Sequence, residues 1–128
     1  MREIKFRVWD GNKMHLPEDE KDKWDSNYML LIDGGLCIDA GEMPLIVAHI
    51  PMQFTGLLDK NGVEIYEGDV IQTVANDGVR LSKFEVVWDN GSCRFKKRRE
   101  DNNHFDMDVI SEGLKEVIGN IYEYPELI

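Results

Sequence analysis

Short apolar segments separated by turn residues make up most of this chain. Residues 4–9 alternate, with Phe6 and Val8 on one side of a predicted strand and Arg7 on the other. Turn pairs recur, the clearest being Asn-Gly at 90–91. The chain lacks the sustained 3.6-residue period of an amphipathic helix. The pattern therefore predicts a mainly β protein, built as a small barrel or sandwich.

The expected strands run through both halves of the chain. They cover residues 4–9, 13–16, 28–32, 36–38, 45–50, 52–58, 63–66, 70–75, 79–89, 92–97, 105–110 and 114–122. Leu81 and Phe84 are three positions apart, which breaks the period of two and predicts a β-bulge near Ser82 or Lys83. We expect residues 1–50 to form a smaller N-terminal β unit and residues 51–128 to form a barrel.

The densest set of turn residues lies in the middle of the chain. Asp59 can accept hydrogen bonds from nearby backbone amides, and Asn61 and Gly62 tolerate positive φ. Gly68 stands between two acids at a second tight reversal, so we expect positive φ there. Asp69 is then placed to accept hydrogen bonds from the amides of that reversal.

Three blocks of sequence carry a family resemblance. Residues 2–10 read Arg-Glu-Ile-Lys-Phe-Arg-Val-Trp-Asp; residues 55–69 hold Thr-Gly-Leu, Asp-Lys-Asn-Gly and Glu-Ile-Tyr-Glu-Gly-Asp in that order; residues 116–127 hold Glu-Val-Ile-Gly-Asn-Ile-Tyr-Glu and then Pro-Glu-Leu. Together they resemble the YopX-like family of phage and prophage proteins, which implies an SH3-type β-barrel or roll and no particular reaction. The chain departs from the family at Tyr124, where the family has Asn before the proline. The residues that carry this structural signature are Gly56, Asp59, Asn61, Gly62, Tyr66, Gly68, Asp69, Gly119 and Asn120.

A basic run is the first candidate for binding chemistry. It consists of an aromatic residue and four cations: Phe95, Lys96, Lys97, Arg98 and Arg99. On a small β-barrel such a run can bind nucleic acid. The alternative is a solvated hairpin end whose charges protect an edge strand. Glu100 and Asp101 follow at once, and the net charge of −10 repels phosphate. We therefore expect no nucleic-acid binding and keep this surface as an alternative.

A second candidate is a set of metal ligands. His104, Asp106 and Asp108 would share one face of a strand. Successive positions on that face are about 6.6 Å apart, so the three groups converge poorly and we expect no metal. The sequence also lacks the GxSxG, HExxH and glycine-rich phosphate-loop motifs. We expect neither an enzyme nor a bound cofactor.

Compartment and assembly complete the expectations. Two cysteines, Cys37 and Cys93, make no disulfide framework and are expected to be reduced and buried. The apolar runs are shorter than a membrane span, and the first residues do not resemble a signal peptide, which predicts a protein of the host bacterium's cytoplasm.

Many short strands leave exposed edges that need covering, so we expect a homo-oligomer. The favoured function is a non-catalytic binding or assembly module of a phage or prophage, with an unidentified phage or host protein as a further partner. One alternative is an acidic protein that binds a host protein.

Overall fold

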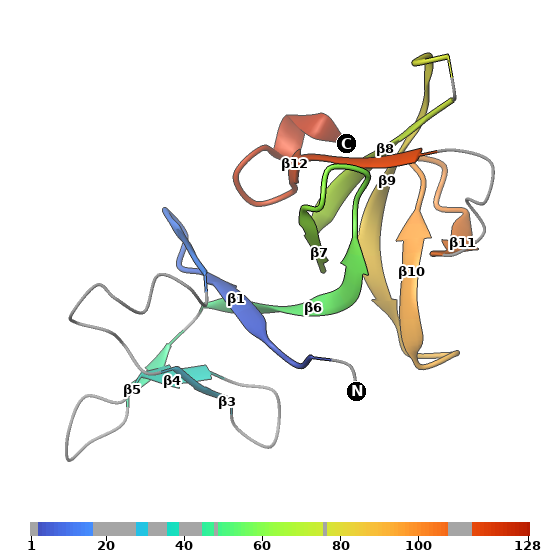
Figure 1. The fold of residues 1–128 in the computed structure, drawn as a ribbon. Helices are drawn as coiled ribbons and strands as arrows, with labels where there is room; N and C mark the ends of the chain where they lie inside the picture. The colour runs from blue at the N-terminus through green and yellow to red at the C-terminus, as the bar shows by residue number, and fades with distance from the viewer. Residues whose placement is uncertain are drawn as a thin grey trace.

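The computed structural model describes residues 3–16, 28–30, 36–38, 45–47, 49–75, 77–107 and 114–128. Within these ranges the chain is almost entirely β, and the helical content is one short 3-10 turn, η2, at Pro125–Leu127. The prediction of a mainly β, barrel-like fold is confirmed (Figure 1). None of the helices described here is long and apolar enough to cross a bilayer.

The described strands form three antiparallel sheets. The first has the order β2-β1-β6-β7, with bounds Met14–His15, Phe6–Trp9, Ile50–Leu58 and Glu64–Tyr66. The second has the order β11-β10-β9-β8-β12, with bounds His104–Asp106, Arg94–Arg98, Arg80–Asp89, Asp69–Val74 and Leu114–Asn120. The third has the order β3-β4-β5, with bounds Tyr28–Leu30, Leu36–Ile38 and Leu45–Val47.

The five-stranded sheet curls, and the β6–β7 hairpin lies against its open side (Figure 1). Backbone hydrogen bonds join the two: the amide of Gly68 donates to the carbonyl of Val86, and the amide of Ile121 donates to the carbonyl of Gly68. Strand β1 pairs with β6, so the first sheet crosses the boundary at residue 50. The proposed division into units 1–50 and 51–128 stays a prediction.

Bulges give the sheets their curvature. In β9 an extra residue lies between Arg80 and Lys83, which confirms the bulge predicted there. In β6 the register shifts between Phe54 and Leu58, at Gly56, whose φ of 87° lies in the left-handed region. The hydroxyl of Thr55 donates to the carbonyl of Ile65 and accepts from the amide of Leu57, which replaces ladder hydrogen bonds lost at the bulge. Strand β6 therefore bends sharply between the part that pairs with β1 and the part that pairs with β7 (Figure 1).

One apolar cluster fills the barrel. Its buried members are Ile65, Ile71, Phe84, Val86, Phe95 and Met107. Phe105 and Val117 pack against this cluster from strands β11 and β12. The core therefore contains residues of both sheets. Packing against it fixes the positions of the turns that join those sheets.

One local expectation is wrong, and one burial was not foreseen. Arg7 faces away from Val8 on β1 but is also buried, because the reversal after β7 covers that side of the strand. Cys93 was expected in a buried strand but lies exposed in the β9–β10 turn, with φ of 52°. Of the two residues in the β6–β7 turn that tolerate positive φ, Gly62 adopts it and Asn61 does not.

Candidate functional site

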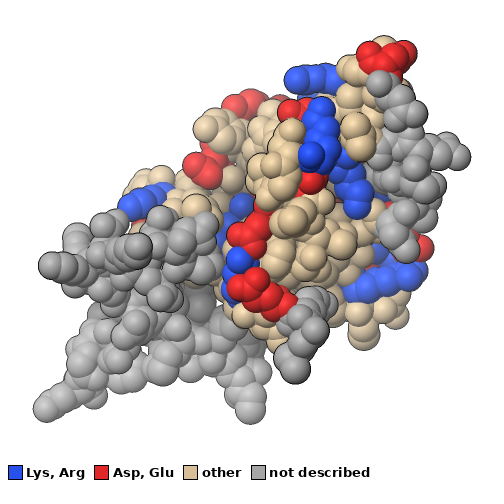
Figure 2. All heavy atoms as spheres, viewed as in Figure 1, with Lys and Arg blue, Asp and Glu red and all other residues tan. Residues whose placement is uncertain are grey.

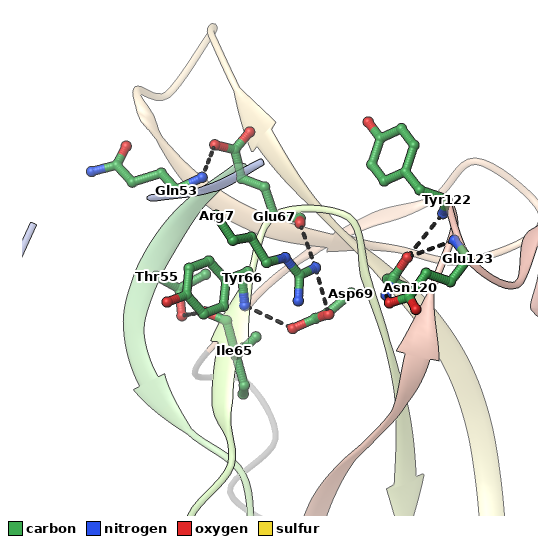
Figure 3. Close-up of polar contacts among 10 residues, drawn as sticks. All are labelled: Arg7, Gln53, Thr55, Ile65, Tyr66, Glu67, Asp69, Asn120, Tyr122 and Glu123. Carbon is green, nitrogen blue, oxygen red and sulfur yellow. Dashed lines mark hydrogen bonds and ion pairs between the residues drawn. The ribbon is translucent and has the colours of Figure 1, made fainter. Parts of the chain in front are cut away.

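The reversal from Tyr66 to Asp69 is the centre of the best-organised polar cluster (Figure 3). Gly68 adopts a φ of 81°, as predicted. The Asp69 carboxylate closes the turn by accepting the Tyr66 amide at 2.8 Å. Its other oxygen accepts from Nη2 of Arg7 at 2.7 Å. Two elements that lie 62 residues apart are therefore joined through one carboxylate that is 1% exposed.

Arg7 makes three different contacts from strand β1. Besides its ion pair, Nη2 donates to the carbonyl of Glu67 at 3.2 Å, and the guanidinium lies 4.7 Å from the centroid of the Tyr66 ring. Burial raises the pKa of Asp69, although the charge of Arg7 and the Tyr66 amide act to lower it. The pair is therefore stable only as a unit, because either charge would be buried alone without the other.

The outer rim of this cluster is acidic. Glu67 accepts the amide of Gln53 at 2.9 Å, and burial raises the pKa of its carboxyl although that amide lowers it. Burial also raises the pKa of the Tyr122 hydroxyl, with the charges of Glu85 and Glu67 adding to the effect. The Glu67 carboxylate is fixed to the backbone of Gln53, and the Tyr122 hydroxyl stays neutral. Both residues therefore have structural roles in this geometry. The cluster acts as a clamp that joins β1, β6 and the β7–β8 reversal.

The C-terminal part of the signature also has a structural role. Asn120 Oδ1 accepts the amides of Tyr122 and Glu123 and so closes the turn after β12 (Figure 3). At Gly119 an added Cβ would lie 2.6 Å from Leu127, so the absence of a side chain lets the tail pack. These contacts explain why Asn120 and Gly119 belong to the signature, and the explanation needs no ligand.

Gly68→Ala should destabilise the protein more than Gly62→Ala. Both glycines have a φ of 81°, so both changes strain the backbone. A Cβ at Gly62 would meet nothing within 4 Å, whereas one at Gly68 would lie 2.9 Å from the ring of Tyr122. We expect a loss of about 1 kcal/mol at Gly62 and about 2–3 kcal/mol at Gly68. Urea unfolding measures both, and equal losses would show that packing at Gly68 adds nothing.

The predicted basic run does not form a continuous basic surface. Three of its cations have carboxylate partners, at 3.1, 2.5 and 2.5 Å: Lys96 with Asp89, Arg98 with Glu85, and Arg99 with Asp101. Phe95 is buried in the core. On the face shown in Figure 2, acidic and basic side chains are also interspersed. This arrangement leaves little positive potential for a phosphate backbone.

Lys97 differs from the other three cations. Its side chain points into the barrel with Phe95, and the residue is 4% exposed. The expectation of a solvated hairpin end is therefore wrong for this residue. Its Nζ lies 4.6 Å from the centroid of the Phe84 ring and 5.9 Å from that of Phe105.

A surface hollow of about 270 Å³ lies beside the outward-facing end of the run. Its lining residues are Glu85, Arg98, Arg99, Glu100, Asn102 and Ile128. The two guanidinium groups are already paired with carboxylates, so the lining is close to neutral in charge. Five of its six lining residues are polar or charged, whereas small-molecule pockets are lined mostly by apolar residues.

The predicted metal ligands are not brought together in the described structure. His104 is exposed on β11, and Asp106 forms an ion pair with Arg94 at 2.7 Å. Asp108 lies outside the described residues. Across the described ranges, no three His, Cys, Asp or Glu side chains are grouped to hold a metal ion.

The burial of Arg7 and Lys97 was not foreseen from the sequence, where Lys97 was a candidate only as part of the basic run. For Lys97 the sequence held a usable signal, because Phe95 is an expected core residue and the two share one face of a strand of period two. For Arg7 the sequence held no such signal, since its burial depends on a distant reversal.

Comparison with known proteins gives a family and a fold. A family model described as YopX protein matches residues 5–128. Protein EF1440 from Enterococcus faecalis, a crystal structure, is similar with a TM-score of 0.63 and 28% identity, covering 99% of each chain. Protein yopX from Bacillus subtilis is similar with a TM-score of 0.65 and 22% identity, covering 100% of this chain and 99% of that one. Among curated proteins, none matches.

Proposed function

The chain belongs to the YopX protein family, and on that premise we propose that it is a non-catalytic binding or assembly module that associates with copies of itself. The resemblance to phage and prophage proteins supports a role in a phage or prophage within the host cytoplasm. The observation that carries the proposal of self-association is an exposed apolar surface at one end of the barrel.

This surface, called here the apolar end, is formed by three neighbouring segments. Its residues are each between 38% and 59% exposed: Leu57, Leu58, Val63, Val79, Leu81 and Leu114. The β6–β7 turn is joined to the start of β12 by the amide of Lys60, which donates to the carbonyl of Lys115. Leu114 in turn pairs with Val74, at the end of β8, where the β8–β9 hairpin begins.

An apolar surface of this kind favours association over a solvated monomer. Contiguous exposed apolar side chains mark interaction sites more often than scattered ones. The charged residues of the signature, by contrast, are engaged inside the protein, Asp69 with Arg7 and Asp59 with backbone amides. The signature therefore supports folding, and the apolar end is the surface left for a partner.

Light scattering during size exclusion should give a mass that is a multiple of the 14.8 kDa chain. Leu58→Glu together with Leu114→Glu should shift the mass to that of the monomer, because two charges at the centre of the surface cannot be desolvated. Both positions are solvent-exposed, so the fold should survive.

Ile4→Glu is the matched control, since Ile4 is an exposed aliphatic residue outside the apolar end. It should leave the mass unchanged. A monomeric starting protein at micromolar concentration, or an oligomer that the double variant retains, would contradict self-association through this surface.

A further inference from the structure

Two Asn-Gly pairs occur in the chain, and both lie in exposed hairpin turns. One is at 61–62, in the β6–β7 turn, and the other is at 90–91, in the turn that joins β9 to β10. Asparagine is chemically labile. Before glycine its side chain reacts most easily with the backbone, because glycine has no Cβ to shield the next nitrogen. The way each turn holds that nitrogen then decides which pair reacts.

The β6–β7 turn holds its Asn-Gly pair through hydrogen bonds to Asp59. The amide of Gly62 donates to the Asp59 carbonyl at 3.1 Å. The amides on either side, those of Asn61 and Val63, donate to Asp59 Oδ1 at 2.8 and 2.9 Å. The nitrogen of Gly62 is therefore engaged, and it reaches the Asn61 side chain only after these bonds are broken.

The β9–β10 turn leaves its Asn-Gly pair free of such bonds. Among the residues that the structure describes, neither the Gly91 amide nor the Asn90 side chain has a hydrogen-bond partner. The polar contacts of this turn involve other atoms. Ser92 Oγ donates to the Asp89 carboxylate at 2.5 Å, and the Cys93 thiol lies 3.5 Å from the Asn90 carbonyl. Both reacting groups can therefore rotate towards each other.

We propose that Asn90 is a site of spontaneous deamidation and that the fold protects Asn61 from the same reaction. The Gly91 nitrogen attacks Cγ of Asn90 while its proton passes to hydroxide. The new N–Cγ bond closes a succinimide ring, the Cγ–Nδ2 bond breaks, and Nδ2 takes a proton from water and leaves as ammonia. Water then opens the ring at either carbonyl, which gives aspartate or isoaspartate. The sequence of steps involves no oxidation or reduction.

The reaction changes the charge and the geometry of one surface turn. It adds a negative charge next to Asp89, and the isoaspartate product also adds a carbon to the backbone of the turn. The apolar end lies at the start of β9, whereas Asn90 follows the last residue of that strand (Figure 1). Deamidation is therefore independent of self-association through the apolar end.

Peptide mapping by mass spectrometry, after incubation of the folded protein at mildly alkaline pH, measures both positions in one sample. Asn90 should react about 2–10-fold faster than Asn61, the factor that a hydrogen bond of ordinary strength at the Gly62 amide contributes. Incubation in urea removes both turns, and the two rates should then become nearly equal. The proposal is overturned if Asn90 stays intact, if Asn61 reacts as fast in the folded protein, or if the difference persists in urea.

Gly91→Ala should slow the reaction at Asn90 and leave the rate at Asn61 unchanged, because the added Cβ shields the attacking nitrogen. The fold accepts this change: Gly91 lies outside the left-handed region, and its Cβ would lie 3.7 Å from Asp89 Oδ1, an ordinary contact distance. Asn61→Gln is the matched control, which alters the other pair and should leave the rate at Asn90 as it is. An unchanged rate at Asn90 in Gly91→Ala would contradict attack by the Gly91 nitrogen.

Discussion

Arg7→Met should be among the most destabilising single changes in the protein, with a loss of about 3–5 kcal/mol at pH 7. The change leaves the Asp69 carboxylate, which is 1% exposed, without its cation. It also removes the hydrogen bond to the Glu67 carbonyl and the contact with the Tyr66 ring. Urea unfolding monitored by tryptophan fluorescence measures the loss. Lys5→Met, which breaks a more exposed ion pair on the same segment of chain, should cost far less.

The pH dependence of the stability lost in Arg7→Met identifies the cause of that loss. Burial already raises the pKa of Asp69, and without Arg7 this pKa should rise further. The folded variant then holds a proton that the unfolded chain releases near its usual pKa of 3.8, so its stability increases as pH falls. The difference in free energy of unfolding between Arg7→Met and the starting protein should therefore become smaller between pH 7 and pH 5.

A double variant separates charge from packing. Arg7→Met with Asp69→Asn removes both charges and keeps an amide oxygen to accept the Tyr66 amide. It should be more stable than Arg7→Met alone, because no charge is left buried without a partner. A double variant no more stable than the single one, or a single loss below about 1 kcal/mol, would mean that the ion pair is not what holds β1 to the reversal.

Most of the strands could be predicted because their signals are local. The turn residues around Gly62, Gly68 and Asn90 mark where strands end, and alternation marks their faces. The bulge in β9 could be predicted from one break in the apolar period, since an extra residue must shift the pattern. The family signature could be recognised because its turns need particular residues, such as glycine at positive φ.

The roles of buried polar residues could not be predicted in the same way. Alternation places Arg7 on the face opposite Phe6 and Val8, but it does not show that the β7–β8 reversal, 62 residues away, covers that face. A run of cations is usually solvated, but β10 places Lys97 on the face of Phe95 and so inside the barrel. Both outcomes depend on long-range packing, which periodicity along a single segment does not contain.

Asp59→Asn should lower the free energy of unfolding by about 1–3 kcal/mol. Asp59 Oδ1 accepts the amides of Asn61 and Val63 within its own turn, at 2.8 and 2.9 Å. Oδ2 accepts the amide of Val117 on β12 at 2.9 Å, which ties the β6–β7 hairpin to the second sheet. An amide side chain can keep one oxygen for the turn, but its NH₂ then faces the Val117 N–H, donor against donor.

The effect of pH on Asp59→Asn should differ from that on Arg7→Met. Burial alone would raise the pKa of Asp59, but the amides of Val117, Val63 and Asn61 together hold it below the usual 3.8. A carboxyl with a depressed folded pKa contributes stability that is present above 3.8 and is lost as pH falls through the folded value. The stability gap between Asp59→Asn and the starting protein should therefore stay constant from pH 7 to pH 5 and narrow only below about pH 4.

Asp77→Asn is the matched control for Asp59→Asn. Asp77 also accepts a backbone amide within its own turn, that of Val79 at 3.0 Å, but it is exposed and the turn is a simple hairpin end. The side-chain amide in Asp77→Asn keeps an oxygen to accept the Val79 amide, and its NH₂ group faces no backbone N–H. The stability of this variant should therefore differ from that of the starting protein by less than about 0.5 kcal/mol. Equal losses in the two variants would show that the bond from β12 to Asp59 contributes nothing. A larger loss in Asp59→Asn alone would show that one signature carboxylate orders its turn and joins the two sheets.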